Sequence, residues 1–452
     1  MNLTAHYRFP SGFLWGTATA AHQVEGDNTA NQWWAWEQAG RVFQGQTSGP
    51  GCGWWRGRWK EDFTRAADAG HNAIRFSVEW SRIQPAPDRW DEDALERYRT
   101  WARTARQMGL EPLVTLHHFT DPLWLHDQGG WEAPAAVDHF RAFAERVVTA
   151  LREYVRLWAT FNEPNIYAYR GYVEGAFPPG RTGDLKAAFT VLERMAQAHA
   201  AAYEVIHRRQ PDAQVGIVLH YRGMRPARAW FPPDRWIARL HHRWLNDFYY
   251  HALVRGRLIG PGLRSRPAPG LRGTLDYLGL NYYTEDRVRF VLRPAEVFGV
   301  HDFPPGVPRS AHGEIAHVPA GLYRALRWAH GFRVPIYITE NGLDDPDDRL
   351  RPRYLLEHLH QVWRALINNW PVRGYLHWSL VDNFEWEWGW TRHFGLWACD
   401  PHTQRRTARP SAHLFAAVAQ ANGFDADLVD RYAPEARPAL FPAAGLDALR
   451  AG

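Results

Sequence analysis

The sequence predicts an α/β fold in which eight parallel strands close into a barrel and helices surround it. Short apolar runs rich in β-branched and aromatic residues recur eight times along the 452 residues, and stretches with helical spacing lie between them. A strand followed by a helix pairs in parallel with the next strand, because a parallel connection needs a crossover. Together these observations predict a single (β/α)8 TIM barrel with long βα loops.

The eight apolar runs are the predicted strands. They cover residues 13–20, 73–78, 113–117, 157–161, 215–219, 277–283, 336–339 and 375–380. The clearest amphipathic stretches between them are predicted helices, at residues 94–108, 135–151, 185–208 and 354–369. An open, doubly wound sheet is the alternative, but such sheets carry a Gly-rich phosphate-binding turn after the first strand. Neither GxGxxG nor GxxxxGK[ST] occurs in this sequence, which favours the barrel.

Three connections are much longer than ordinary βα loops. They span about residues 22–70, 221–272 and 284–330, and long loops at one end of a barrel build the walls of its active site. We expect one barrel domain over residues 1–423. Residues 424–452 are predicted to form a C-terminal extension that packs on the barrel or at a subunit contact, not a second domain.

Composition argues against several classes of partner. The 53 basic and 48 acidic side chains give a net charge of only +5 with no dense basic run, so no nucleic acid is expected. No stretch approaches the roughly 18 apolar residues of a membrane span, and the N-terminus lacks a secretory pattern, so no membrane partner is expected. Two cysteines, Cys52 and Cys399, favour a reducing cytoplasm, although the sequence leaves open one bridge between them.

The 24 tryptophans allow two interpretations. Indole rings pack against the C–H faces of sugars and can donate one hydrogen bond, but they also fill large cores. Composition alone does not decide between these roles.

Two glutamates follow predicted strands. Glu163 ends the fourth run, in TFNEP, and Glu340 ends the seventh, in YITENG. Barrel enzymes carry catalytic groups at the carboxyl ends of their strands. Either glutamate alone would more often be a salt-bridge partner, but two that face one cavity are less expected by chance. Hydrolysis of a glycosidic bond requires such a pair, one to protonate the departing oxygen and one to act at the anomeric carbon.

Five motifs in the sequence resemble those of glycoside hydrolase family 1, the retaining β-glucosidase family. They are RFSVEWSRI, TFNEP, GLNYYT, ITENG and HWSLVDNFEWEWGW, in the family's order. The resemblance runs from FPSGFLWGTATAAHQVEG at the start to about residue 423. It implies the barrel fold and a glycosidase activity.

The resemblance also implies four catalytic residues. Glu163 matches the acid/base and Glu340 the nucleophile, and Arg75 and Tyr283 match the groups that orient the nucleophile and keep it ionised. A guanidinium beside Glu340 is expected to lower its pKa. Glu163 is expected to lie in apolar surroundings with a raised pKa, because it must hold a proton near neutral pH.

A second set of residues is implied to bind the substrate's sugar. The set is Gln23, His118, Phe119, Asn162, Asn281, Trp378, Glu385 and Trp386. Asn162 is expected to bond the 2-hydroxyl, Trp378 to stack under the ring, and Glu385 to accept from the outer hydroxyls and to repel a phosphorylated sugar. Without the resemblance, Gln23 and His118 would be interpreted as buried polar groups bonded to the backbone. Phe119 departs from the family, which more often has tryptophan, so one contact near the 3-hydroxyl is expected to be weaker.

The expected function is a retaining exo-β-glycosidase that hydrolyses terminal β-D-glucosides, and also β-D-fucosides and β-D-galactosides, with transglycosylation as a side reaction. The expected partners are small-molecule β-glycosides or oligosaccharides. A homo-oligomer is left open. No cofactor or metal is expected, since neither HExxH nor CxxC occurs. The alternative function is a catalytically disabled barrel that binds carbohydrate.

Overall fold

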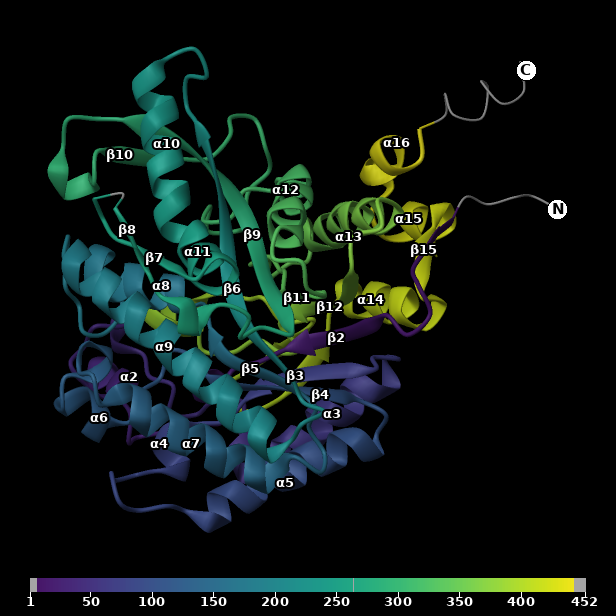
Figure 1. The fold of residues 1–452 in the computed structure, drawn as a ribbon. Coiled ribbons are helices and arrows are strands. Elements are labelled where there is room, and N and C mark those ends of the chain that lie inside the picture. Colours follow the sequence, from purple (N-terminus) through teal and green to yellow (C-terminus); the bar gives the residue numbers. More distant parts are fainter. Residues whose placement is uncertain (1–5, 263, 443–452) are drawn as a thin grey trace.

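The computed structural model describes residues 6–262 and 264–442, which form a closed barrel surrounded by helices (Figure 1). Eight parallel strands pair in the order β2, β3, β4, β5, β6, β9, β11, β12, and β12 pairs with β2 to close the ring. They are β2 (Leu14–Ala18), β3 (Ala73–Ser77), β4 (Glu111–His117), β5 (Leu157–Asn162), β6 (Gln214–Pro226), β9 (Tyr277–Phe290), β11 (Ile336–Glu340) and β12 (Val372–Trp378). The predicted (β/α)8 barrel is confirmed, and each predicted strand overlaps one of these eight.

The longer helices form the outer layer. They are α3 (Trp59–Asp68), α5 (Glu92–Gln107), α7 (Ala136–Leu151), α9 (Leu185–Arg209), α10 (Pro232–Leu245), α11 (Asp247–Arg255), α12 (Pro319–His330), α13 (Arg351–Ile367) and α14 (Pro410–Ala421). Local sequence fixes where α5 and α9 begin. The carboxylates of Asp91 and Asp184 accept the backbone N–H groups of Ala94 and Ala187, at 2.8 and 3.0 Å, and so cap the free ends of these helices.

The shorter elements lie in the connections and at the chain ends. The helices are α1 (Ala21–Val24), α2 (Gln32–Gln38), α4 (Trp80–Ile83), α6 (Leu123–Asp127), α8 (Pro164–Tyr169), α15 (Ala426–Tyr432) and α16 (Arg437–Leu440). The strands are β1 (His6–Arg8), β7 (Arg257–Ile259), β8 (Ser265–Pro267), β10 (Gly299–Asp302), β13 (Trp397–Cys399), β14 (Arg406–Ala408) and β15 (Gly423–Asp425). None of the described helices is long and apolar enough to cross a membrane.

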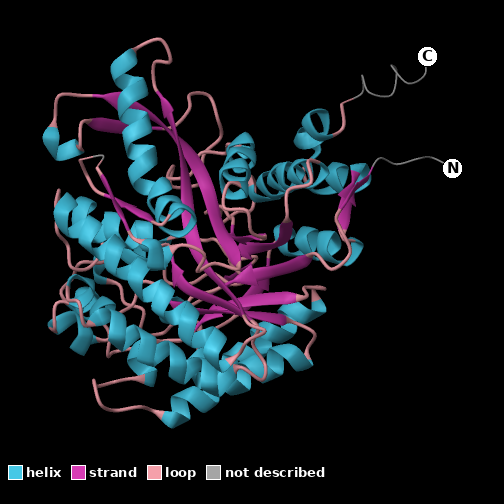
Figure 2. Ribbon diagram, in the orientation of Figure 1, coloured by secondary structure: helices cyan, strands magenta, loops and turns pink. Residues whose placement is uncertain are grey.

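Two barrel strands run well past the ring. β6 and β9 have 13 and 14 residues and stay paired from Gly216 opposite Tyr277 to Pro226 opposite Val288. β10 then adds to β9 in antiparallel register. Figure 2 shows this long ribbon continuing beyond the barrel with a helix alongside it, which is α10 in Figure 1. The two connections that start at residues 221 and 284 are predicted to be loops, but their first residues continue strands β6 and β9.

Many tryptophans lie in the core. Six are among the largest side chains exposed by less than 2%: Trp15, Trp33, Trp54, Trp80, Trp131 and Trp158. Trp378 and Trp386 are also buried, and both line a pocket of about 1040 Å³. The core-filling interpretation therefore holds for many tryptophans, and sugar contact by Trp378 and Trp386 stays a prediction.

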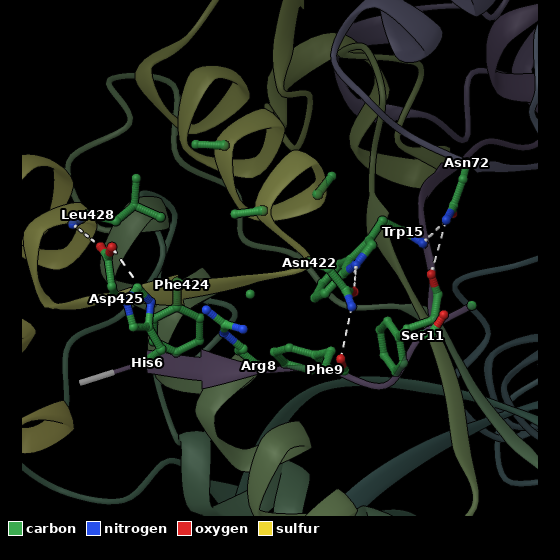
Figure 3. A pocket seen from close by; sticks show the side chains of 16 residues that line it. His6, Arg8, Phe9, Ser11, Trp15, Asn72, Asn422, Phe424, Asp425 and Leu428 are labelled. Carbon is green, nitrogen blue, oxygen red and sulfur yellow. Dashed lines mark hydrogen bonds and ion pairs between the residues drawn. The ribbon is translucent and has the colours of Figure 1, made fainter. Parts of the chain in front are cut away.

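The two ends of the described chain meet at the amino ends of the barrel strands. β15 pairs antiparallel with β1, and the Tyr7 hydroxyl donates to the Leu440 carbonyl in α16. Figure 3 shows the pocket that lies here, between β1, α14 and the start of β2. The predicted extension 424–452 is described as far as residue 442, and its last ten residues lie outside the described part. Cys52 and Cys399 are both free and buried.

Candidate active site

The barrel brings the predicted catalytic residues together at the carboxyl ends of its strands. Arg75 comes from β3, Glu163 directly follows β5, Tyr283 lies on β9, and Glu340 ends β11. All four side chains are within one connected set of hydrogen bonds.

Glu340 is held by two donors. Arg75 Nη1 donates to Oε1 at 2.6 Å, and the Tyr283 hydroxyl donates to Oε2 at 2.7 Å. Arg75 is wholly buried and is itself fixed by Thr115 and Asn162, at 3.0 and 2.6 Å. A guanidinium with this many fixed partners has one orientation, so it presents Glu340 to the pocket in one geometry.

Burial raises the pKa of Glu340 to about 7. The positive charge of Arg75 and the hydrogen bonds from Tyr283 and Arg75 act to lower this pKa, whereas the negative charge of Glu163 raises it further. The predicted lowering effect of Arg75 is present, but the net pKa of this carboxyl is raised and not lowered. The guanidinium does act in the predicted direction, but removal of the carboxylate from water outweighs it.

Glu163 lies in polar surroundings, which corrects the apolar environment predicted for it. Asn281 Nδ2 donates to Oε1 at 2.7 Å, and His220 Nδ1 lies 3.0 Å from the same oxygen. Burial acts to raise the pKa of Glu163, but the charge and hydrogen bond of His220, together with the Asn281 hydrogen bond, hold it below its ordinary value. The prediction of a raised pKa for Glu163 is therefore wrong, because the net shift is downward.

His220 is a site residue that sequence reasoning missed. It directly follows the fifth predicted strand, 215–219, as Glu340 directly follows the seventh, 336–339, and Glu163 is the second residue after the fourth, 157–161. Its Nε2 is buried without a partner in the described part of the chain. Applying the strand-end rule to all eight strands, and not only to those followed by glutamate, would have found it.

A chain of amides connects the two carboxyl groups. Asn281 also donates to Asn162 Oδ1 at 3.2 Å, and its own oxygen accepts from the Thr339 hydroxyl at 2.7 Å. Asn162 Nδ2 contacts His118 Nε2 at 3.0 Å. Because each amide is held at both ends, the positions of Glu163 and Glu340 are mutually fixed.

The other predicted sugar-binding residues gather at one end of the site. Gln23 Nε2 donates to Asn383 Oδ1 at 3.0 Å, to the Phe384 carbonyl at 2.7 Å and to Glu385 Oε2 at 3.3 Å. Gln23 Oε1 and His118 Nδ1 are buried with no partner among the described residues. Buried polar atoms are normally paired, so two unpaired ones at one place are expected where a polar ligand binds.

Aromatic rings surround these polar groups. The His118 ring stacks 5.9 Å from Trp378 and 6.0 Å from Trp386, and Phe119 packs edge-on to Trp386 at 5.2 Å. Burial, followed by the charges of Glu387, Glu340 and Asp344, raises the pKa of Glu385 well above its ordinary value.

One pocket of about 1040 Å³ contains most of the predicted residues. It is lined by His118, Phe119, Asn162, Glu163, Tyr283, Glu340, Trp378, Glu385 and Trp386. Gln23, Arg75 and Asn281 do not line it and lie behind the residues that do, where they hold Glu385, Glu340 and Glu163.

Sequence comparison gives relatives over most of the chain. The model of glycosyl hydrolase family 1 matches residues 5–424. β-Glucosidase A of Thermotoga maritima is 32% identical over 448 residues, covering 92% of this chain and 99% of the relative. A β-galactosidase of Sulfolobus acidocaldarius is 30% identical over 487 residues, covering 93% and 96%.

Solved structures agree with this assignment. A β-glycosidase from Pyrococcus horikoshii superposes with a TM-score of 0.89 at 35% identity and covers 95% of this chain and 98% of its own. The β-glucosidase from Thermotoga maritima in complex with glucoimidazole gives a TM-score of 0.87 at 30% identity and covers 92% and 100%. The chain therefore belongs to glycosyl hydrolase family 1 and is a β-glycosidase of that family.

Proposed function

We propose that this β-glycosidase is a retaining, exo-acting enzyme in which Glu340 is the nucleophile and Glu163 the acid/base. The observation that carries this proposal is the clamp on Glu340: a buried guanidinium and a tyrosine hydroxyl each bond one of its oxygens. Glu163 lines the same pocket and is connected to that clamp through Asn281 and Asn162.

The reaction has two steps. In the first, Glu340 Oε attacks the anomeric carbon while Glu163 gives its proton to the glycosidic oxygen, and the aglycone leaves as an alcohol. In the second, the Glu163 carboxylate takes a proton from water, whose oxygen attacks the anomeric carbon and releases Glu340. A sugar hydroxyl that replaces water in this step gives transglycosylation.

The first step needs the proton on Glu163 and the negative charge on Glu340. The two carboxyl groups share one buried site, so ionisation of either disfavours ionisation of the other. His220 Nδ1 lies 3.0 Å from Glu163 Oε1, and its charge and hydrogen bond hold the pKa of Glu163 down, so removal of this imidazole should favour the protonated acid.

The sugar end of the pocket supports recognition of one terminal unphosphorylated sugar. Trp378 offers a ring face and His118 Nδ1 offers an unpaired polar atom to its hydroxyls, and Gln23, behind the lining residues, holds Glu385 in place. A protonated Glu385 donates as well as accepts, and an ionised one repels phosphate. Because relatives include both β-glucosidases and β-galactosidases, we include β-D-glucosides, β-D-galactosides and β-D-fucosides among the substrates.

Initial rates on aryl β-glucoside, galactoside, fucoside and 6-phosphoglucoside test this proposal. Fast release from the unphosphorylated substrates is expected, and proton NMR of the first product should show the β-anomer. The α-anomer as first product would contradict the retaining mechanism. Silence from folded protein across the panel would favour the alternative, a carbohydrate-binding barrel without activity.

Two further expectations belong to the same proposal. We place residues 424–452 with the barrel as an extension of its single domain, supported by the pairing of β15 with β1. We place the enzyme in the cytoplasm, supported by its two free, buried thiols.

A further inference from the structure

The residue before the proposed nucleophile is bound to a residue that holds the proposed acid. Thr339 immediately precedes Glu340 at the end of β11, and its hydroxyl donates to Asn281 Oδ1 at 2.7 Å. Asn281 Nδ2 in turn donates to Glu163 Oε1 at 2.7 Å. Thr339 and Asn281 are both fully buried, so bulk water does not compete for either bond. Two neutral side chains therefore connect the strand end that carries Glu340 to the carboxyl group of Glu163.

An irregularity in β11 makes this contact possible. In a regular strand successive side chains point to opposite faces, so a residue next to Glu340 would point away from the site. The register between β11 and β9 shifts between Ile338, opposite Leu280, and Glu340, opposite Asn281. Thr339 lies in this shift, and a bulge of this kind re-aims the side chains beside it. Thr339 therefore reaches Asn281 while Glu340 reaches the pocket.

The neighbouring strand leaves room for the threonine side chain. Gly279 lies two residues before Asn281 on β9, on the same face of the strand. A Cβ on Gly279 would come within 3.1 Å of both Oγ1 and Cγ2 of Thr339, and within 2.6 Å of Val218 Cγ2. Glycine at position 279 therefore makes the space in which the hydroxyl of Thr339 meets the Asn281 amide.

Asn162 determines which way the Asn281 amide faces. Arg75 Nη2 donates to Asn162 Oδ1 at 2.6 Å, and Asn281 Nδ2 donates to the same oxygen at 3.2 Å. With the amide reversed, the Asn281 oxygen would face two other oxygens, those of Asn162 and Glu163. Thr339 completes the arrangement, because its hydroxyl gives Asn281 Oδ1 the donor that a buried oxygen needs.

The two oxygens of the Glu163 carboxyl are not equivalent. Both of its hydrogen bonds within the described part of the chain end on Oε1, from Asn281 Nδ2 at 2.7 Å and His220 Nδ1 at 3.0 Å. The hydrogen of the His220 ring belongs on Nδ1, because an N–H at the buried Nε2 would have no acceptor among the described residues. Oε1 thus accepts two N–H groups, and a proton on this carboxyl is left with Oε2.

We propose that Thr339 is a positioning residue for the acid: it holds Asn281 against Oε1 and thereby keeps the transferable proton of Glu163 on Oε2. The inference rests on the proposed function, since it names the atom of Glu163 that acts in the first step. In that step the Oε2 proton moves to the glycosidic oxygen, the bond from this oxygen to the anomeric carbon breaks, and Glu340 forms the new bond to that carbon. Thr339 does not line the pocket and acts through Asn281.

The test compares two β-D-glucosides that differ in their need for the acid. Phenoxide is a poor leaving group and needs the proton, whereas dinitrophenoxide leaves without one. Thr339→Val removes the hydroxyl and keeps the shape of the side chain. We expect kcat/KM to fall about tenfold for phenyl β-D-glucoside and less than about twofold for dinitrophenyl β-D-glucoside. An equal loss on both substrates, or no loss on either, would overturn the proposal.

Three further variants locate the effect. Thr339→Ser restores the hydroxyl and should return the phenyl glucoside rate to within about twofold of wild type. Thr17→Val is the matched control, because Thr17 is equally buried on barrel strand β2 but its hydroxyl has no partner in the described chain; neither rate should change. If T339V does not fold, Thr339→Ala deletes the same hydroxyl and should show the same difference between substrates. That difference in T17V, or no recovery in T339S, would contradict the role of the Thr339 hydroxyl.

Failure of the proposed function would look different. Glu163→Gln cannot supply a proton, so kcat/KM for the phenyl glucoside should fall at least about 100-fold while the dinitrophenyl glucoside is little affected. If E163Q keeps the wild-type rate on the phenyl glucoside, Glu163 is not the acid, whatever Thr339 does. If E163Q shows the expected difference and T339V does not, the acid stands and only the role of Thr339 falls.

Discussion

The two pockets at opposite ends of the barrel strands differ in how their polar groups are used. At the amino end, Asn422 Oδ1 accepts from the Trp15 indole at 2.9 Å and its Nδ2 donates to the Phe9 carbonyl at 2.8 Å (Figure 3). Asn72 likewise bonds the backbone of Trp15 and Phe13, at 2.7 and 3.0 Å. These polar groups hold strand ends together.

At the carboxyl end the polar groups are held in place but left incomplete. Gln23 Oε1, His118 Nδ1 and His220 Nε2 are buried and have no partner in residues 6–262 and 264–442. Burial also raises the pKa of Glu340 to about 7. What points to the carboxyl end as the functional site is the combination of unpaired buried groups and shifted carboxyls around one pocket.

The largest expected effect is at Glu340. Glu340→Gln keeps the shape of the side chain but removes the attacking charge, so kcat/KM for an aryl β-glucoside should fall at least about 10⁴-fold. The variant leaves the buried Arg75 without its charged partner, and the free energy of unfolding should fall by about 3 kcal/mol, measured by urea denaturation. Wild-type turnover in E340Q would end the assignment of the nucleophile.

The amino-end pocket should respond in stability alone. Asn422→Ala removes the bonds to Trp15 and Phe9 and places alanine at a φ of 48°, so unfolding free energy should fall by about 2 kcal/mol with kcat/KM unchanged. Asn422→Gly, which accepts that φ, separates the lost hydrogen bonds from the backbone strain. A loss of activity in folded N422A would contradict a purely structural role for this pocket.

The third prediction concerns pH. The pKa of Glu340 is raised to about 7 and that of Glu163 is held below its ordinary value, so the pair keeps its one proton only below about pH 7 and kcat/KM should fall as the pH rises above about 7. His220→Ala removes the charge that holds the pKa of Glu163 down, which moves more of that proton onto Glu163, and kcat/KM below pH 7 should rise. His413→Ala, at an exposed position on α14, is the control and should leave the profile unchanged. An unchanged kcat/KM below pH 7 in H220A would separate His220 from the acid.

The smallest effect is expected at Phe119. Phe119→Trp keeps a ring face on the pocket and adds an indole N–H, so kcat/KM for the glucoside should rise by about two- to fivefold. The matching 3-deoxy glucoside should gain nothing. An equal gain for both substrates would show that the effect comes from packing and not from the added donor.

Sequence reasoning found most of the barrel because its strands are apolar and buried on both faces. It missed the extensions of β6 and β9, which read HYRGMRP and TEDRVRF after the apolar runs end. These segments stay paired with the help of an ion pair, Arg222 Nε to Asp286 Oδ2 at 2.6 Å. A hydrophobic pattern cannot reveal a contact of that kind.

The same limit explains the errors in the site. Sequence motifs predict which residues belong to the site. In the structure most of them line one pocket, and the others lie directly behind its lining. The environment of Glu163 depends on His220, which is 57 residues away in sequence and meets it only when β5 and β6 pair. Its pKa direction is therefore a property of the closed barrel and not of the TFNEP string.

The backbone of Glu163 has a consequence for trapping the reaction. Its φ of 45° and ψ of 53° lie in the left-handed region, which glycine adopts freely and alanine does not. Glu163→Gly thus deletes the carboxyl without added backbone strain and opens a space beside Asn281 and His220. With an aryl glycoside whose leaving group needs no proton, azide can enter that space and attack the glycosyl–Glu340 ester, and a β-glycosyl azide would then accumulate.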